Sequence, residues 1–294
     1  MTAATTLTAP RMASVPVTVI VPVRNEEENL ATCLPRLARF AHVVVIDSGS
    51  DDRTCEIAAA HGAEVLRFAW NGRFPKKRNW YLTTHRPPTD WVLFLDADEF
   101  VDDAFCDEVQ AALARDDHDG YWLNYSNHFL GRRLRHGVAQ RKLALFRFGR
   151  ALYERIDEAG WSGLDMEVHE HPLVEGSVGE IATPIDHRDD RGLPKFIARH
   201  RDYAMWEARR TLAIRAAPAE SWASLTRRQR NKYRNIDAWW YAPAYFFVDY
   251  VAQRGFLDGG AGFALAFYKA WYFATIRLLI REAQRGVALH PAGR

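Results

Sequence analysis

The sequence predicts an α/β protein with a Rossmann-like, mostly parallel sheet, flanking helices and a helical region at the C-terminal end. Three observations predict this fold class. Short β-branched runs alternate with helical stretches over the first hundred residues, which is typical of β-α-β units. Each run ends in a polar cluster, and aromatic residues concentrate in the last third of the chain. Ligands of such sheets bind at the carboxyl ends of the strands, so the polar clusters mark the expected site.

The individual elements follow from these patterns. Strands are expected at 17–21, 42–46, 64–68, 91–95, 121–125 and 143–147. A helix opens at 25–29 with acidic residues in its first turn, and another spans 54–61. Residues 149–171 are loop-like, and 193–216 carries apolar residues at helical spacing. We therefore expect a disordered leader over 1–14, an α/β domain over 15–190 and a helical region over 191–294.

The C-terminal region is apolar and aromatic, but the sequence does not predict a membrane span. Residues 238–248 are uncharged and far shorter than the roughly 20 residues that a bilayer requires. Asp258 and Lys269 interrupt the next apolar stretch, 255–276. Either a buried helix pair or an amphipathic surface in a membrane interface fits this pattern. The Asp-Gly pair that begins at Asp258 indicates a turn between two helices.

The charge and the cysteine content indicate which binding partners and which cellular compartment fit the protein. The formal net charge of +2 is too small to indicate nucleic acid. Residues 188–234 carry 13 Lys or Arg against 5 Asp or Glu, which fits a solvated helix face or a surface that meets anionic lipid. Three widely spaced cysteines without a secretory signal indicate a reducing cytosol. We expect a cytoplasmic protein in peripheral contact with the inner face of the cytoplasmic membrane.

A D-x-D triplet ends the fourth strand. Asp96 and Asp98 flank one alanine directly after the apolar run, and Glu99 follows them. Alternating carboxylates at a strand end can face a metal ion and a ribose. Mg²⁺ and Mn²⁺ prefer oxygen ligands and commonly keep substrate phosphates as partners. The alternative is a solvated turn without a ligand.

A second carboxylate, Asp47, ends the strand at 42–46. It can accept a hydrogen bond from a base or a ribose, while Gly49 permits a close approach of the backbone. A helix-capping loop, with Ser50 or Asp51 as the cap, is the other interpretation. Both interpretations can hold together.

Three motifs in this order and spacing resemble the family 2 glycosyltransferases. They are Val19-Ile20-Val21-Pro22-Val23-Arg24-Asn25-Glu26, Asp47-Ser48-Gly49-Ser50 and Leu95-Asp96-Ala97-Asp98-Glu99. Segments 70–74, 76–80, 168–170 and 254–259 also resemble the branch that builds lipopolysaccharide core and other surface glycans. The resemblance covers nearly the whole chain after Ser14.

The resemblance implies a GT-A fold, a nucleotide-diphosphate sugar donor, inversion at the anomeric carbon, Mg²⁺ or Mn²⁺ as cofactor, and a glycan acceptor that is lipid-linked. The residues that match the family's nucleotide-sugar site are Pro22, Asn25, Glu26, Asp47, Gly49, Lys77, Arg78 and Asp96. Asp98 would hold the metal, with Asp96 in support and His169 as a further ligand. Arg141, Lys142 and Arg147 are candidates for a phosphate clamp.

The catalytic base is expected in the acidic segment 165–171. Inverting transfer requires a carboxylate that takes the proton of the attacking hydroxyl group. The match to the family's V-H-E makes Glu170 the first candidate and Glu167 the second. A polar surface loop is the alternative. His187 also matches a family position, although a core or capping histidine fits as well.

Other functions fit the sequence less well. A nucleotidyltransferase also uses strand-end carboxylates and a metal, but a glycine-rich basic loop would follow its first strand. A nicotinamide dehydrogenase is disfavoured because no G-x-G-x-x-G follows that strand. A catalytically silent, membrane-bound scaffold of a glycan assembly complex would not need the intact Asp96, Asp98 and Glu170.

Overall fold

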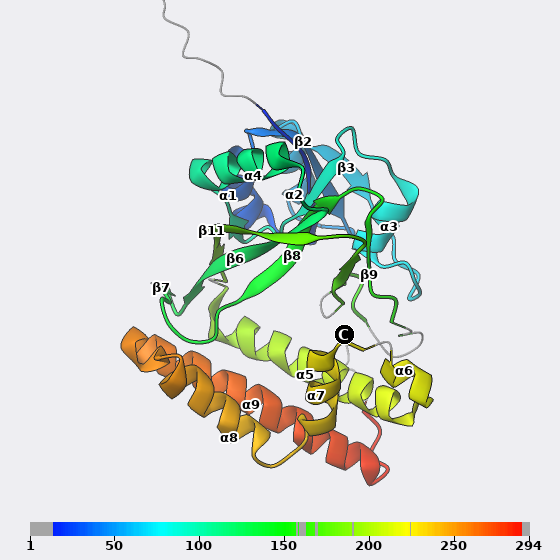
Figure 1. Cartoon of the computed structure of the whole chain (residues 1–294), viewed down its shortest axis with the longest axis vertical. Coiled ribbons are helices and arrows are strands. Elements are labelled where there is room, and N and C mark those ends of the chain that lie inside the picture. Colours follow the sequence, from blue (N-terminus) through cyan, green and yellow to red (C-terminus); the bar gives the residue numbers. More distant parts are fainter. Residues whose placement is uncertain are drawn as a thin grey trace, which may run out of the picture.

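Among the residues that the computed structural model of the protein describes, nine strands form one mixed sheet (Figure 1). The structure describes residues 14–156, 158, 163–167, 170–189, 191–223 and 225–289. The strands of this sheet are β1 (Val15–Val23), β2 (Phe40–Asp47), β3 (Glu64–Arg67), β4 (Trp91–Phe94), β5 (Glu99–Phe100), β6 (Gly120–Phe129), β7 (Arg132–Arg133), β8 (Arg141–Arg147) and β11 (Val178–Arg188). Their order in space is β3-β2-β1-β4-β8-β6-β11-β5, with β7 paired to β6.

The half of the sheet that contains the first four strands is parallel. β1 pairs with β2 and β4, and β2 pairs with β3. β1 is buried along nearly its whole length, as a parallel strand covered on both faces must be. In the other half β8 is antiparallel to β4 and β6, while β6 and β11 are parallel. β8 follows β6 through a short connection, which only an antiparallel pair permits. The six predicted strands are confirmed, and the parallel arrangement holds for the first four.

Helices and a small second sheet complete the described α/β part. The helices are α1 (Glu27–Arg36), α2 (Thr54–Ala60), α3 (Lys77–Thr84) and α4 (Asp103–Arg115). The main core joins buried side chains of the central strands to those of α1 and α4, for example Leu30, Phe105 and Leu145. β9 (Ala151–Tyr153) and β10 (Pro172–Val174) form a two-stranded sheet at the ends of the stretch that the sequence marks as loop-like.

The C-terminal helices form a separate layer (Figure 1). They are α5 (Gly192–Ala216), α6 (Ala219–Ala223), α7 (Arg227–Asn235), α8 (Tyr241–Phe246), the π-helical segment η1 (Phe247–Ala252), the 3₁₀ turn η2 (Gly255–Asp258) and α9 (Gly259–Gln284). α9 packs against α5 and α8. A second apolar cluster, which includes Ala204, Ile236 and Ile276, holds this layer together.

Two buried carboxylates attach the helical layer to the β7–β8 loop. Asp258 accepts hydrogen bonds from the backbone N–H groups of Arg135 (3.0 Å) and His136 (2.8 Å). Asp249 accepts one from the N–H of Val138 over 2.6 Å. The predicted turn at Asp258 is confirmed, since η2 ends there and Gly259 begins α9 with a φ of 63°.

The last helical stretch is exposed for much of its length. Gly255–Gln284 is long and apolar enough to cross a membrane, and only 17% of its most apolar window is buried. This is weak evidence, because core helices of soluble proteins pass the same test of length and composition. The large apolar side chains exposed between α7 and the end of α9 are Trp239, Trp240, Phe247, Val248, Val251, Phe256, Leu257, Phe263, Phe267 and Leu278. A fully buried helix pair therefore does not describe this region.

Candidate active site

Hydrogen bonds tie together the loops that follow β1 and β2. The N–H of Asn25 donates to Ser50 Oγ (2.9 Å), and Asn25 Oδ1 accepts from the N–H of Asp51 (3.0 Å). The N–H of Glu26 donates to Thr54 Oγ1 over 2.8 Å. Asn25 has a φ of 55°, in the left-handed region where Asn is more frequent than most other residues. The two predicted polar clusters thus form one surface at the carboxyl ends of adjacent strands.

Asp47 is buried at the end of β2 and binds its own turn. Its carboxylate accepts from the N–H groups of Gly49 (3.0 Å) and Ser50 (3.1 Å) and from Arg67 Nη1 (2.6 Å). Burial acts to raise the pKa of Asp47, but the hydrogen bonds from Ser50 and Gly49 outweigh it and lower this pKa below its usual value. Pro22 lies on the neighbouring strand, buried near the end of β1. The role of Asp47 toward a base or ribose stays a prediction.

Asp96 lies between two cationic side chains. Its Oδ1 accepts from Arg78 Nη2 and its Oδ2 from Lys142 Nζ, each over 2.8 Å. Lys142 also forms an ion pair with the buried Glu99. Burial opposes ionisation, but the ion pairs with Lys142 and Arg78 hold the pKa of Asp96 well below its usual value. Both oxygens of this ionised carboxylate are therefore bound by protein cations.

The cationic groups around the Asp98 carboxylate lie farther away than those around Asp96. Its Oδ2 lies 3.8 Å from His187 Nε2 and 3.7 Å from Arg191 Nη2. Arg191 donates through its other terminal nitrogen to Glu26 Oε1 over 2.6 Å, and so links the β1 loop to the D-x-D turn. Burial raises the pKa of Asp98, and the charge of Asp96 adds to this effect. No cation contacts the Asp98 carboxylate at hydrogen-bond distance among the residues described.

The Asp98 carboxylate fits a divalent cation. It is a buried oxygen ligand whose ionised form is poorly compensated by the protein. The described part of the chain contains no group of three or more His, Cys, Asp or Glu side chains that could hold a metal. Mg²⁺, however, is commonly held by one or two carboxylates together with substrate phosphates rather than by a protein cage. The donor set thus suits an ion that arrives with a diphosphate. The Asp96 oxygens are already engaged, which favours Asp98 as the ligand.

The first turn of α3 connects this cluster to the second acidic segment. Lys77 is buried and donates from Nζ to the Val23 carbonyl oxygen at the end of β1 over 3.1 Å. The N–H groups of Arg78 and Asn79 donate to the two oxygens of Glu167 at 2.8 and 2.9 Å. A carboxylate in this position stabilises the start of a helix. Glu167 is therefore engaged in holding α3 in place, which makes it the weaker candidate for the base.

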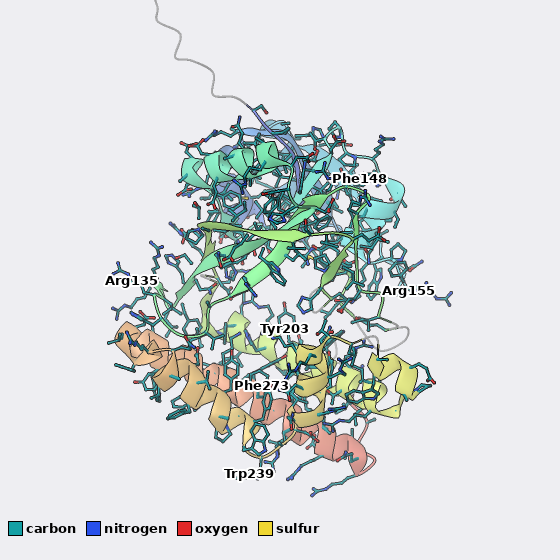
Figure 2. The ribbon with its side chains drawn as sticks, viewed as in Figure 1. Arg135, Phe148, Arg155, Tyr203, Trp239 and Phe273 are labelled. Carbon is teal, nitrogen blue, oxygen red and sulfur yellow. The ribbon has the colours of Figure 1, made fainter. Side chains whose placement is uncertain are left out.

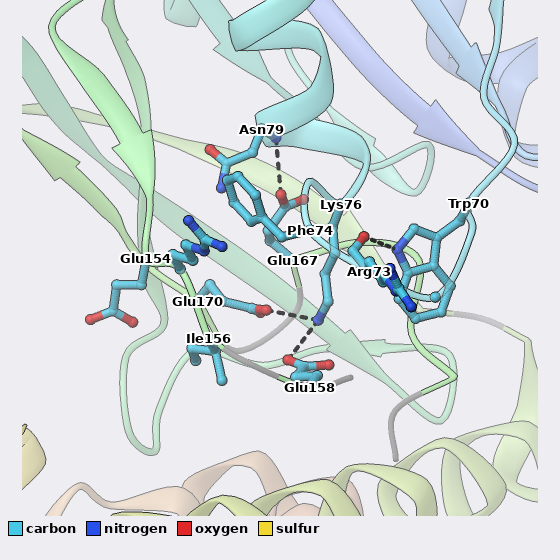
Figure 3. A pocket seen from close by; sticks show the side chains of 12 residues that line it. Trp70, Arg73, Phe74, Lys76, Asn79, Glu154, Ile156, Glu158, Glu167 and Glu170 are labelled. Atoms are coloured by element: carbon cyan, nitrogen blue, oxygen red, sulfur yellow. Dashed lines mark hydrogen bonds and ion pairs between the residues drawn. The ribbon is translucent and has the colours of Figure 1, made fainter. Parts of the chain in front are cut away.

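A cavity of about 500 Å³ lies beside α3 (Figure 3). Lys76 Nζ donates to Glu170 Oε1 and to Glu158 Oε1 in this cavity, each over 2.7 Å, and all three side chains are buried. Burial raises the pKa of Glu170 to about 7; Lys76 opposes this rise and the charge of Glu158 adds to it. A carboxyl group that titrates near neutral pH is suited to general base catalysis.

The structure does not bring all the predicted residues together. The guanidinium of Arg141 lies over the Trp122 ring at 4.8 Å, whereas Lys142, the next residue of β8, reaches Asp96. Successive residues of a strand point to opposite faces, so only one of the two can face the site. His169 lies outside the described residues.

Three further residues join the site without having been singled out from the sequence as candidates for it. Lys76 belongs to the basic run 76–78, which the sequence does mark. Glu158 and Arg191 have no local signal, because their partners lie far away in the chain.

Comparisons with known proteins match part of the chain to a family model. Residues 18–163 match the model described as glycosyl transferase family 2. The lipopolysaccharide core biosynthesis glycosyltransferase LpsC of Rhizobium meliloti is 28% identical over 57% of this chain and 61% of its own length. The 4,4'-diaponeurosporenoate glycosyltransferase of Staphylococcus haemolyticus is 36% identical over 28% of this chain and 24% of its own length. The chain thus spans less than two thirds of these curated relatives.

The solved structures that are similar to this chain superpose on it with low TM-scores. TarS of S. aureus is 13% identical, with a TM-score of 0.45 over 92% of this chain and 91% of that chain. Glucosyl-3-phosphoglycerate synthase from Mycobacterium tuberculosis, in complex with Mn²⁺ and uridine diphosphate, is 24% identical, with a TM-score of 0.28 over 33% of this chain and 39% of that chain. These overlaps are too loose to bear on the function of this chain.

Proposed function

We propose that the protein moves a sugar, with inversion, from a nucleotide-diphosphate sugar to a hydroxyl group of a surface-glycan acceptor, because residues 18–163 match the family 2 glycosyl transferase model. Its α/β part is a mixed sheet with flanking helices, which is compatible with the GT-A fold that the resemblance implies. One observation carries the proposal: at the start of α3, Arg78 contacts Asp96 of the D-x-D turn and Lys76 contacts the buried Glu170. A donor site next to a base is what inverting transfer needs.

The donor is expected at the ends of β1, β2 and β4. The linked loops of Asn25 and Glu26 are suited to the nucleoside, with Asp47 behind them. Arg78 and Arg191 supply positive charge next to Asp96, Asp98 and Glu26, and Lys77 lies at the end of β1. Such preorganised cations stabilise the charge that develops on a leaving diphosphate.

Asp98 would hold Mg²⁺ or Mn²⁺ in this site. When bound, the ion supplies charge neutralisation to the diphosphate. Arg191 and His187 stay beside the same carboxylate, and Arg191 keeps the β1 loop in place through Glu26.

Glu170 is the proposed base. Its carboxylate takes the proton of the acceptor hydroxyl group while that oxygen forms a bond to the anomeric carbon. The bond from the anomeric carbon to the diphosphate oxygen breaks, and its electron pair leaves with the nucleoside diphosphate. Lys76 holds Glu170 in orientation through its 2.7 Å contact. After transfer the proton is released from Glu170 to solvent.

A peripheral position on an anionic membrane, with a lipid-linked acceptor, is part of the proposal. Trp239, which is 72% exposed, lies at the edge of the helical layer away from the sheet (Figure 2). Phe247, Phe263 and Phe267 are also exposed on the following helices. α7, just before them, carries an arginine cluster made of Arg227, Arg228, Arg230 and Arg234. Exposed aromatic side chains next to basic ones match the interface of an anionic bilayer.

The enzymatic proposal is tested by donor turnover. A panel of nucleotide-diphosphate sugars is screened for hydrolysis with Mn²⁺ or Mg²⁺, and we expect one donor to be hydrolysed only with metal. Asp98→Ala should abolish this activity, while Asp90→Ala, at an exposed position, should not. A catalytically silent scaffold would hydrolyse none. If calorimetry with metal detects no binding of any nucleoside diphosphate, the proposal fails.

A further inference from the structure

Glu158 has a buried carboxylate oxygen without a hydrogen-bond partner in the described part of the chain. The residue is 4% exposed and lines the cavity beside Glu170 (Figure 3). Its Oε1 accepts from Lys76, whereas its Oε2 has no hydrogen-bond partner among the residues that the structure describes. A buried carboxylate oxygen without a donor carries a desolvation cost. Such an oxygen is therefore a place where a bound molecule can donate.

Lys76 fixes both carboxylates in one arrangement. It lies 2.7 Å from an oxygen of Glu158 and 2.7 Å from an oxygen of Glu170. A molecule that donates to Glu170 can therefore reach Glu158 with a neighbouring group. Two donors on adjacent atoms suit this spacing, and adjacent hydroxyl groups of a sugar ring are such donors.

The rest of the cavity suits a neutral polyhydroxyl ligand. Its volume of about 500 Å³ is in the usual range for small-molecule sites. Trp70 and Phe74 supply aromatic surface, and the Trp70 indole is held by a 2.8 Å hydrogen bond to the Arg73 carbonyl. Arg73 and Arg155 also line the cavity. Together with Lys76 they disfavour a cationic ligand, which would otherwise compete for the carboxylates.

We propose that this cavity is the acceptor-sugar site and that Glu158 accepts a hydrogen bond from the hydroxyl group adjacent to the one that reacts. The enzyme then selects acceptors with a vicinal diol. Glu158 is a binding residue, and Glu170 remains the base. This inference rests on the proposed function, in which the acceptor loses its proton to Glu170.

The inference is tested by a double-mutant-type cycle, in which one change is made in the protein and the other in the acceptor. Methyl glycosides of glucose, galactose and mannose are screened as acceptors with the donor found by hydrolysis. The best glycoside is then compared with its deoxy analogues in the wild type and in Glu158→Gln. In the wild type, loss of the neighbouring hydroxyl should raise the acceptor KM about tenfold or more. In Glu158→Gln, Lys76 takes the amide oxygen, and the NH2 group that replaces Oε2 cannot accept a hydrogen bond. The same loss should then change KM by less than about threefold, because both changes remove the one accepted hydrogen bond.

Two controls show whether a change in KM comes from the proposed hydrogen bond or from misfolding of the variant. Glu175→Gln, the same substitution at an exposed position, should behave as the wild type. The wild-type comparison of glycoside and deoxy analogue needs no variant, so a misfolded Glu158→Gln does not remove the test. Equal KM losses in both proteins, or no loss in the wild type, overturn the inference.

Binding can be measured even without turnover. If no donor reacts, the proposed function fails, and the same glycosides are then examined by saturation-transfer NMR. Binding that weakens about tenfold in the deoxy analogue supports the site. Absence of binding by every glycoside overturns it.

Discussion

Arg78 donates to Asp96 over 2.8 Å, while its own backbone N–H is bound by Glu167. One residue of α3 thus contacts both the D-x-D turn and the segment that carries the proposed base. The position of α3 therefore sets the separation between the donor side and the acceptor side of the site. The contact with Glu167 joins residues 89 positions apart in the sequence, so it depends on the folded sheet.

Removal of this ion pair should destabilise the fold. Arg78→Met leaves Asp96 with Lys142 alone and removes a guanidinium that is almost completely buried. Breaking a buried pair by removing one partner typically costs about 3–5 kcal/mol, and the partial exposure of Asp96 places this variant at the lower end. Urea unfolding measures the loss. Arg86→Met, at an exposed position after α3, should change the free energy of unfolding by less than about 0.5 kcal/mol.

Asp98→Asn should separate stability from function. Burial raises the pKa of Asp98, so its ionised form is less stable in the folded than in the unfolded chain. The neutral amide should therefore leave the melting temperature unchanged or raise it, while metal-dependent donor hydrolysis is lost. Asp96→Asn should lower the melting temperature, because it weakens two ion pairs. A drop in stability for Asp98→Asn would contradict the assigned environment.

Transfer should depend on the ionisation of Glu170. Its pKa of about 7 means that the active, ionised form accumulates as the pH rises through neutrality, so the rate should fall below about pH 7. Lys76→Met removes the cation that favours ionisation and should move this acid limb to higher pH. Glu158→Gln removes a neighbouring negative charge and should move it to lower pH. The position of the acid limb is measured from transfer rates at saturating donor across pH 5.5–9. A shift of about 0.5 pH unit can be resolved. Shifts of the same sign in both variants would contradict the arrangement.

Glu170→Gln should bind the donor and lose transfer. The amide keeps the shape and the contact with Lys76 but cannot take a proton, and loss of a general base typically costs about 10²–10⁴ in rate. Calorimetric titration with the nucleoside diphosphate and single-turnover transfer measure the two properties. Retained turnover would assign the base to another acid of the 165–171 segment.

Membrane binding should require both aromatic and basic residues. The protein should sediment with vesicles that contain anionic phospholipid, and 0.5 M salt should release it. A double change of Arg227 and Arg228 to Glu should reduce vesicle partitioning at least about tenfold, and Trp239→Ser should also weaken it. Leu173→Ser, at an exposed apolar residue of β10, is the matched control. Resistance to a carbonate wash would instead indicate that Gly255–Gln284 crosses the bilayer.

The strands of the parallel half and the polar clusters at their ends could be predicted from the sequence. Both are properties of consecutive residues, because burial on both faces requires an apolar run and a strand must end in a turn. Which polar side chains contact one another depends on the tertiary structure. Arg141 and Lys142 are adjacent basic residues that the sequence alone does not distinguish as ligands of the site. The register of β8 places only Lys142 beside Asp96. Lys76 meets Glu158 and Glu170, which lie 82 and 94 residues away, only where the packing of α3 brings these segments together. Local patterns carry no information about such distant pairs, since the partners are chosen by packing rather than by neighbours in the chain.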